Sequence, residues 1–174
     1  MKEQVNLNEL NALVYQAVKN NGDVSEYINK MNFEEITAQM WHLSTENPDY
    51  AKAMLGFIDP ERFTESIKEL FWATSALEAA LPHAKQLNDK EKTTLYHNYI
   101  TLLIIYVSNI YNPALLNEDD IRVLPQSHRF GYFMYEAQKC LGDNDSSGYV
   151  KNLKTALTMD KSKSDIISTL INQL

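Results

Sequence analysis

Apolar side chains recur every three or four residues along this chain of 174 residues. Such spacing places them on one face of a helix. The pattern is clear in the central series Leu95, Tyr99, Leu102, Leu103, Tyr106 and Ile110, and in an early series from Leu7 to Val18. No stretch shows the sustained alternation of apolar and polar residues that is typical of a half-buried strand. The sequence therefore predicts an all-α protein with about eight or nine helices.

Proline marks several of the predicted helix boundaries. Asn47-Pro48 and Asp59-Pro60 each have the pattern of a helix start, because proline is tolerated in the first turn, where its missing N–H costs nothing. The second pair predicts a long helix from Pro60 to about Leu81. Pro82 must end or kink that helix, because proline lacks the backbone donor and clashes with the preceding turn.

Capping patterns predict the other boundaries. Asn88 with Glu91 three residues later fits a capping box and opens a central helix. Gly22 is predicted to end the first helix and Ser127 to cap a later one. The predicted helices from the capping box onward cover residues 89–111, 129–141, 149–159 and 162–174.

Short turns between successive helices imply antiparallel neighbours, so we expect a stack of helical hairpins. Its predicted parts are an N-terminal bundle over residues 1–112, a connecting loop over 113–127 with one short helix around Asp119 to Leu124, and C-terminal helices over 128–174, joined in one compact unit. The tail, from Arg129 to Leu174, is expected to pack as three helices with Ala137 and Ala156 in the seam. Small residues at such a seam let two helix axes approach to about 8–10 Å.

Composition argues against two classes of partner and indicates a compartment. The formal net charge is -7, and the chain has only three arginines and no run of basic residues, so we expect no nucleic-acid partner. The most apolar stretch, residues 100–110, is too short for a membrane span, which needs about 20 residues. The single cysteine, Cys140, cannot form an internal disulfide, which favours a reducing compartment and predicts a cytoplasmic protein.

The sequence shows no pattern typical of a catalytic, metal or cofactor site. None of its four histidines lies three or four residues from another, and its five glycines are too scattered for a phosphate-binding loop. Glu61, Glu65 and Glu69 would share one face of the predicted helix, and we interpret that face as solvated. The acidic run 118–120 after Asn117 is interpreted as helix capping. We therefore expect no catalytic residue, no metal ligand and no cofactor.

Tyrosine is the most unusual feature of the composition, with ten residues. Tyr132 and Tyr135 lie three residues apart on one predicted helix, close to Arg129. Tyrosine and arginine are favoured at binding surfaces, because they combine apolar area with a polar end. These three residues are the predicted binding site. The alternative is that the tyrosines line seams between helices with their hydroxyls at the rim.

The tail resembles a tetratricopeptide-type hairpin. Two segments are similar to each other: one, 17–28, has Gly22-Asp23 at its turn, and the other, 137–150, has Gly142-Asp143. In each, glycine is expected to supply the left-handed residue that ends a helix. The resemblance to the tetratricopeptide family covers Tyr135 to Met159. It implies a tetratricopeptide-like helical hairpin, although Lys161 stands where that family usually has proline.

A second resemblance covers about Leu124 to Leu174. It rests on Leu124-Pro125, His128-Arg129-Phe130, Gly142-Asp143 and a pattern that runs from Tyr149-Val150 to Ala156-Leu157. These motifs are similar to the helical region that follows the catalytic domain in some bacterial family-two glycosyltransferases. The resemblance implies a non-catalytic appendage of such an enzyme, or a free-standing relative of it.

Three hypotheses about function follow. The first is a non-catalytic helical module that binds a protein or peptide partner. The second is an enzyme whose site is assembled from dispersed residues such as His128, Arg129 and Glu136. The third is a small regulatory or oligomerising bundle, and a homodimer is compatible with it.

Overall fold

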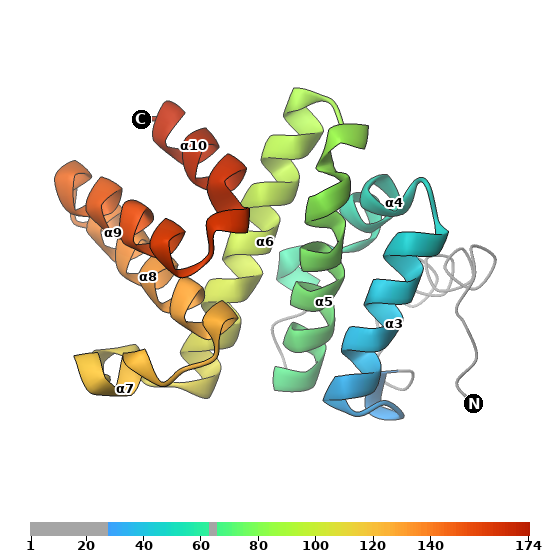
Figure 1. Ribbon diagram of the computed structural model, residues 1–174, viewed down its shortest axis with the longest axis horizontal. Coiled ribbons are helices and arrows are strands. Elements are labelled where there is room, and N and C mark those ends of the chain that lie inside the picture. The colour runs from blue at the N-terminus through green and yellow to red at the C-terminus, as the bar shows by residue number, and fades with distance from the viewer. Residues whose placement is uncertain (1–27, 63–65) are drawn as a thin grey trace. The chain divides into compact units, whose positions relative to one another are not determined.

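Every regular element in the described part of the chain, residues 28–62 and 66–174 of a computed structural model, is a helix (Figure 1). The prediction of an all-α fold is confirmed. The chain divides into two compact units, Met1–Leu102 and Leu103–Leu174, and the division falls inside helix α6 (Asp89–Ile110). The early series from Leu7 to Val18, the predicted stop at Gly22 and the segment 17–27 lie outside the described residues.

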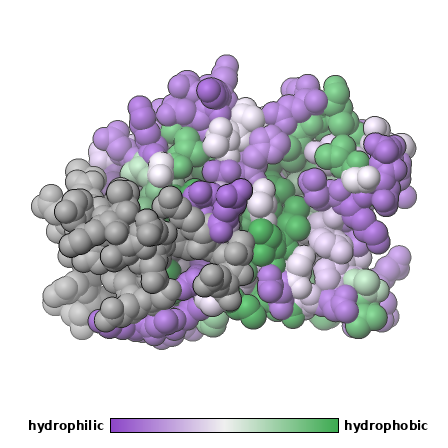
Figure 2. All heavy atoms as spheres, turned by 180° about the vertical axis from the view of Figure 1, so that it is seen from behind, coloured by the Kyte–Doolittle hydropathy of each residue, from purple (hydrophilic) through white to green (hydrophobic). Residues whose placement is uncertain are grey.

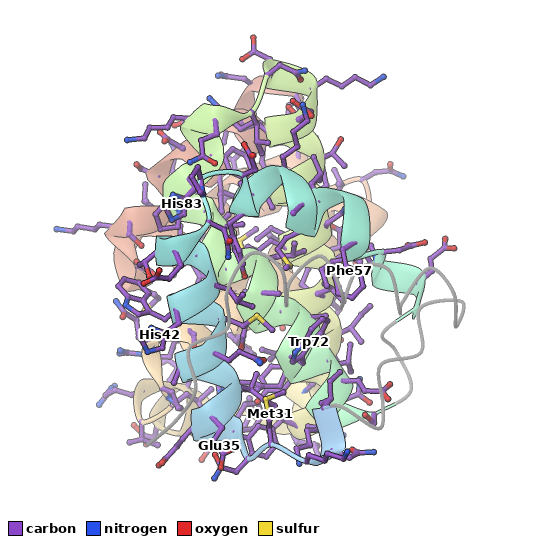
Figure 3. All side chains as sticks on the ribbon, turned by 90° about the vertical axis from the view of Figure 1, so that its right-hand side faces the viewer. Met31, Glu35, His42, Phe57, Trp72 and His83 are labelled. Atoms are coloured by element: carbon purple, nitrogen blue, oxygen red, sulfur yellow. The ribbon has the colours of Figure 1, made fainter. Side chains whose placement is uncertain are left out.

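The first unit is built around helix α5. Helix α3 packs along α5, while α4 packs on α5 and on the short η2. The Tyr50 hydroxyl, at the start of α4, donates a hydrogen bond of 2.8 Å to the Ala76 carbonyl of α5. Phe57 meets the Trp72 ring edge-on at 5.6 Å, and Figure 3 shows the two side by side. The elements are α3 (Phe33–Glu46), α4 (Tyr50–Phe57), η1 (Pro60–Arg62), α5 (Ile67–Ala80) and η2 (Leu81–Gln86).

Asn47 ends a helix instead of starting one, so this part of the prediction was wrong. Its backbone N–H donates to the Leu43 carbonyl at 3.2 Å and its side-chain amide donates to the same oxygen at 2.8 Å. Asp49 is the N-cap of α4. The residue before a proline is pushed out of the helical region, and Asn47 is extended, with φ -114° and ψ 111°. Pro48 therefore stops α3 at this point.

The predicted helix from Pro60 to Leu81 was also wrong in its first half. η1 ends at Arg62, and α5 begins only at Ile67. The Ser66 hydroxyl accepts a hydrogen bond of 3.0 Å from the Glu69 backbone N–H, so Ser66 is the N-cap. The helix therefore starts from the Ser66 cap and not from Asp59-Pro60. Glu61 and Glu69 therefore do not share one helix, and Glu65 lies outside the described residues. The predicted end is confirmed, since η2 takes over at Leu81.

The capping box of α6 is confirmed. Asn88 Oδ1 accepts from the Glu91 N–H at 2.8 Å, and Glu91 Oε1 accepts from the Asn88 N–H at 3.1 Å. The helix then runs for 22 residues and buries Leu95, Tyr99, Leu102, Leu103 and Tyr106. It ends before Pro113, as predicted. The prediction for Ile110 was wrong: it is the last residue of α6 and is exposed. The other five positions match the periodicity of the sequence.

In the second unit, α8 and α9 form an antiparallel hairpin and α10 packs on α9. Ala137 and Ala156 are buried, as the seam of the predicted three-helix tail requires. Within the segment predicted as a connecting loop, residues 113–127, two short helices form. The second, α7, is the short helix expected around Asp119 to Leu124, and the first, η3, was not predicted. The elements are η3 (Pro113–Leu115), α7 (Glu118–Arg122), α8 (Gln126–Gly142), α9 (Ser146–Met159), η4 (Lys161–Lys163) and α10 (Ser164–Asn172).

Two predictions about caps in this unit were wrong. Ser127 does not cap α8, because that helix begins at Gln126 and its N-cap is Pro125. Gly142 is still helical, and the left-handed residue of the turn is Asn144, with φ 59°. Asparagine tolerates this conformation better than most residues. Asp145 then caps α9 by accepting a hydrogen bond of 2.9 Å from the Gly148 N–H.

A buried ion pair holds the corner between α9 and α10. Lys163 Nζ lies 2.9 Å from Asp160 Oδ2 and 5.9 Å from the centre of the Phe130 ring of α8. Ser162 adds a side-chain hydrogen bond of 2.6 Å to the same carboxylate. This contact connects the three helices of the tail at one point.

Candidate functional site

The predicted binding residues lie on the solvent side of α8. This helix buries Phe130, Met134 and Ala137 along one face. Because successive residues are rotated by about 100°, Arg129, Tyr132 and Tyr135 fall on the remaining half of the helix, and all three are half-buried. Together with Glu136 they are called the α8 face below. The structure thus brings the predicted residues onto one surface, although Arg129 and Tyr135 lie at its opposite edges.

Tyr132 is held by its neighbours on the same helix. Burial raises the pKa of Tyr132, and the charge of Glu136 and a hydrogen bond with that carboxylate raise it further, as does Tyr135. Its ring meets Phe133 edge-on at 5.1 Å. The phenol therefore stays neutral at physiological pH and offers a fixed aromatic surface, with Glu136 as its hydrogen-bond partner.

Arg129 has hydrogen-bonding capacity to offer. Its Nε is buried and has no hydrogen-bond partner among the described residues. A guanidinium is always charged and presents its N–H groups in a rigid fork that matches a carboxylate or a phosphate. A buried donor without a partner costs free energy. The residue as a whole is half-buried and its side chain forms no hydrogen bond or ion pair with the described residues, so the charge and shape of its guanidinium make Arg129 the residue of the α8 face that best matches an anionic group.

His128 lies in a cluster of aromatic residues next to the α8 face. The Tyr111 hydroxyl lies 2.7 Å from His128 Nδ1, and which of the two donates depends on the histidine tautomer. The rings of Tyr106 and Tyr111 meet the imidazole edge-on at 5.7 and 5.5 Å. Burial raises the pKa of both tyrosines, and for Tyr106 the charge of Tyr111 adds to this. The sequence did not predict this cluster, since Tyr111 and His128 are 17 residues apart.

The residues of the enzyme hypothesis have separate partners. His128 contacts Tyr111, and Glu136 bonds Tyr132. Elsewhere, His42 on α3 and His83 on η2 lie apart along one edge of the first unit (Figure 3). Within residues 28–62 and 66–174, no group of three or more His, Cys, Asp or Glu side chains is placed to hold a metal ion.

None of the helices formed by the described residues is long and apolar enough to cross a membrane. No protein-family model matches the sequence, and no curated protein or solved structure is significantly similar to it.

Proposed function

We propose that this chain is a non-catalytic helical interaction module that binds a protein or peptide partner through the α8 face. The observation that carries the proposal is that Arg129 is half-buried and its side chain forms no hydrogen bond or ion pair among the described residues. Two half-buried tyrosines, Tyr132 and Tyr135, stand on the same surface. Arginine and tyrosine supply a large share of the binding energy at protein interfaces. A rigid helix positions them more accurately than a loop would.

The architecture of the tail supports this role. Helices α8 and α9 form a hairpin with small buried residues in its seam, and α10 packs on α9. Stacked helical hairpins generally present extended surfaces that bind peptides or partner domains. In our proposal the tail is tetratricopeptide-like and related to the accessory helical region of bacterial family-two glycosyltransferases. The module would then act in the cytoplasm beside such an enzyme.

An enzymatic role is the second candidate, and the Tyr111–His128 contact favours it. A short hydrogen bond between a hydroxyl and an imidazole is an arrangement used for proton transfer. The raised pKa of Tyr111 makes the phenol a poorer acid at neutral pH, so this pair is better suited to hold a structure than to donate a proton. We therefore prefer the interaction module.

The proposal is tested by site-specific photo-crosslinking. A benzophenone amino acid in place of Tyr132 should capture a partner. The same group at Trp41, which is 63% exposed on α3, should not capture that partner. The captured protein is then purified and titrated by calorimetry against wild type, Arg129→Ala and Tyr132→Ala. We expect each substitution to weaken binding by about 1–2 kcal/mol, which is roughly 5- to 30-fold.

Two results would count against it. Equal affinity for wild type and both variants would remove the α8 face from the interaction. Capture of the same protein from Trp41 would show that the contact is not specific to that face. The relationship to glycosyltransferases is tested separately, by whether the captured protein carries a glycosyltransferase domain.

A further inference from the structure

The outer side of α9 is a basic surface. The helix buries Tyr149, Leu153 and Ala156, and its opposite side forms a shallow, open hollow of about 570 Å³. Two lysines are the only charged residues of this helix, in a chain whose net charge is -7. The residues that line the hollow, called the α9 face below, are Ser147, Val150, Lys151, Lys154, Thr155 and Thr158.

The lysines hold the unused binding capacity of this face. The Thr155 hydroxyl donates to the Lys151 carbonyl at 3.0 Å, and the Thr158 hydroxyl donates to the Thr155 carbonyl at 2.6 Å. Their protons are therefore occupied by the helix itself. Lys151 and Lys154 form no ion pair within residues 28–62 and 66–174. Two ammonium groups and the apolar Val150 remain to recognise a ligand, which selects for a partner that is both acidic and apolar.

The same unit carries a segment of that chemistry. Residues 113–124, called the α7 arm below, contain Leu115 and Val123, which are 76% and 81% exposed and are the most exposed large apolar side chains in the described part of the chain. In Figure 2, green apolar residues stand among purple ones at the lower right, where this segment lies. The α7 arm therefore offers two uncovered apolar side chains to a partner.

Acidic residues separate the two apolar ones. The run 118–120 contributes three carboxylates and Arg122 one positive charge, so the arm has a net charge of -2. Asp119 Oδ1 lies 3.7 Å from Arg122 Nη1, but the two side chains are 89% and 73% exposed. An exposed ion pair of this kind contributes little free energy. Asp120 accepts a hydrogen bond from the Asn117 N–H at 3.1 Å, so Glu118 and Asp119 are the carboxylates that remain available to a second set of lysines.

We propose that the α9 face of one copy binds the α7 arm of a second copy, which makes the chain a homodimer. Lys151 and Lys154 meet the run 118–120, and Leu115 or Val123 packs on Val150 and the lysine stems. The two surfaces carry opposite charges of equal magnitude, +2 on the α9 face and -2 on the α7 arm, and both belong to residues 103–174. In a two-fold dimer each contact is made twice and the assembly closes on itself.

The size and character of the surfaces determine how tight the dimer is. Six residues on one side and a short arm on the other make an interface at or below the usual lower limit of about 1,200 Å² for a stable complex. Its polar part consists of exposed charges, which salt screens beyond about 10 Å at 0.1 M ionic strength. We expect a dimer with a Kd in the micromolar range, weakened at least tenfold between low salt and about 0.5 M salt.

The test is a reciprocal charge reversal, followed by sedimentation equilibrium of the full chain at low salt. The face variant, Lys151→Glu with Lys154→Glu, and the arm variant, Glu118→Lys with Asp119→Lys, should each be monomeric. An equimolar mixture should form a heterodimer, because both contacts then pair opposite charges. The control, Lys90→Glu with Lys92→Glu on α6, makes the same charge change elsewhere and should dimerise like wild type.

Several outcomes would overturn the proposal. The first is a wild-type chain that stays monomeric at all concentrations, even if it binds a foreign acidic peptide. The second is a mixture of the two variants that does not restore the dimer although both variants have wild-type circular dichroism. If a reversal variant is misfolded, Lys151→Gln with Lys154→Gln takes its place and should weaken the dimer at least tenfold. Arg129→Ala and Tyr132→Ala should dimerise normally, so this inference and the proposed function can fail independently.

Discussion

Gly131 is the position where one added methyl group tests the packing of the second unit most directly. It lies in α8 and faces the last turns of α6. An ideal Cβ built on Gly131 would lie 2.7 Å from Val107 Cγ2 and 3.1 Å from Leu103 Cγ. Carbon atoms in contact prefer a separation of about 3.5–4.0 Å. Gly131→Ala therefore forces either the neighbouring side chains or the helices to move.

Two opposing effects determine the result. Replacing glycine by alanine inside a helix gains about 1 kcal/mol from helix propensity, whereas overpacking a buried site costs typically 1–3 kcal/mol. Val107 is fully buried and branched at Cβ, so it has essentially one rotamer in a helix and cannot turn away. We expect overpacking to dominate and Gly131→Ala to lower the free energy of unfolding by about 1 kcal/mol.

The same helix offers a matched control. A Cβ on Gly142 would meet nothing within 4 Å, so Gly142→Ala should leave the free energy of unfolding unchanged or raise it by up to about 1 kcal/mol. Both values are measured by urea unfolding. A Val107→Ala background removes the closer of the two contacts and leaves the one to Leu103 Cγ at 3.1 Å, so Gly131→Ala should then cost less than in wild type. An increase in stability for Gly131→Ala in the wild-type background, equal to that of Gly142→Ala, would refute the close approach of the two helices.

Three further predictions concern the tail and its chemistry. Burial would raise the pKa of Asp160, but hydrogen bonds from Ser162 and Lys163 and the lysine charge lower it overall. The free energy of unfolding of wild type should therefore fall as the pH drops below about 4. Asp160→Asn should lose part of this pH dependence, measured by urea unfolding from pH 5 to 2. An identical pH dependence in the variant and wild type would contradict this. Ala156→Leu should lower the melting temperature, because it overpacks the α8–α9 seam at a cost of about 1–3 kcal/mol. The control Thr155→Leu, on the outer side of α9, should not lower it. Equal melting temperatures for Ala156→Leu and wild type would remove the case for a tetratricopeptide-like seam. Calorimetry should detect no binding of a nucleotide sugar with Mg²⁺ or Mn²⁺, and tight stoichiometric binding would contradict the non-catalytic role.

Features that depend on a few neighbouring residues could be predicted well. The Asn88–Glu91 box opens α6 as expected. The interpretation of the acidic run after Asn117 as capping is confirmed too. Asn117 Oδ1 accepts from the Asp120 N–H at 2.9 Å, and Asp120 Oδ2 accepts from the Asn117 N–H at 3.1 Å. Both pairs are reciprocal hydrogen bonds between residues three apart, so their formation depends mainly on the local sequence and little on the tertiary packing.

Prediction failed where two local signals competed. Asp59-Pro60 and Ser66-x-x-Glu69 are both helix starts, and the second one begins α5. At Asn47 the same side chain could start one helix or end another, and burial of the residue, which is 1% exposed, selects the second role. A buried amide N–H group needs an acceptor, and the Leu43 carbonyl at the end of α3 accepts from the Asn47 side-chain N–H. Local patterns do not contain this information.

The aromatic cluster shows why the candidate site could be predicted only in part. Arg129, Tyr132 and Tyr135 share one helix, so helical periodicity alone places them together. The Tyr111–His128 contact instead depends on how closely α8 approaches α6. Gly131 allows that approach, because it has no Cβ to meet Val107.

One turn before Gly131 on α8 is His128, and one turn after Val107 on α6 is Tyr111, which is the pairing that antiparallel packing requires. Gly131 thus permits the helix separation at which these two side chains lie within a hydrogen bond of 2.7 Å. In the sequence Gly131 is an isolated glycine inside a helical pattern, where it costs about 1 kcal/mol relative to alanine. The close contact that it permits offsets this cost and explains its place in the middle of α8.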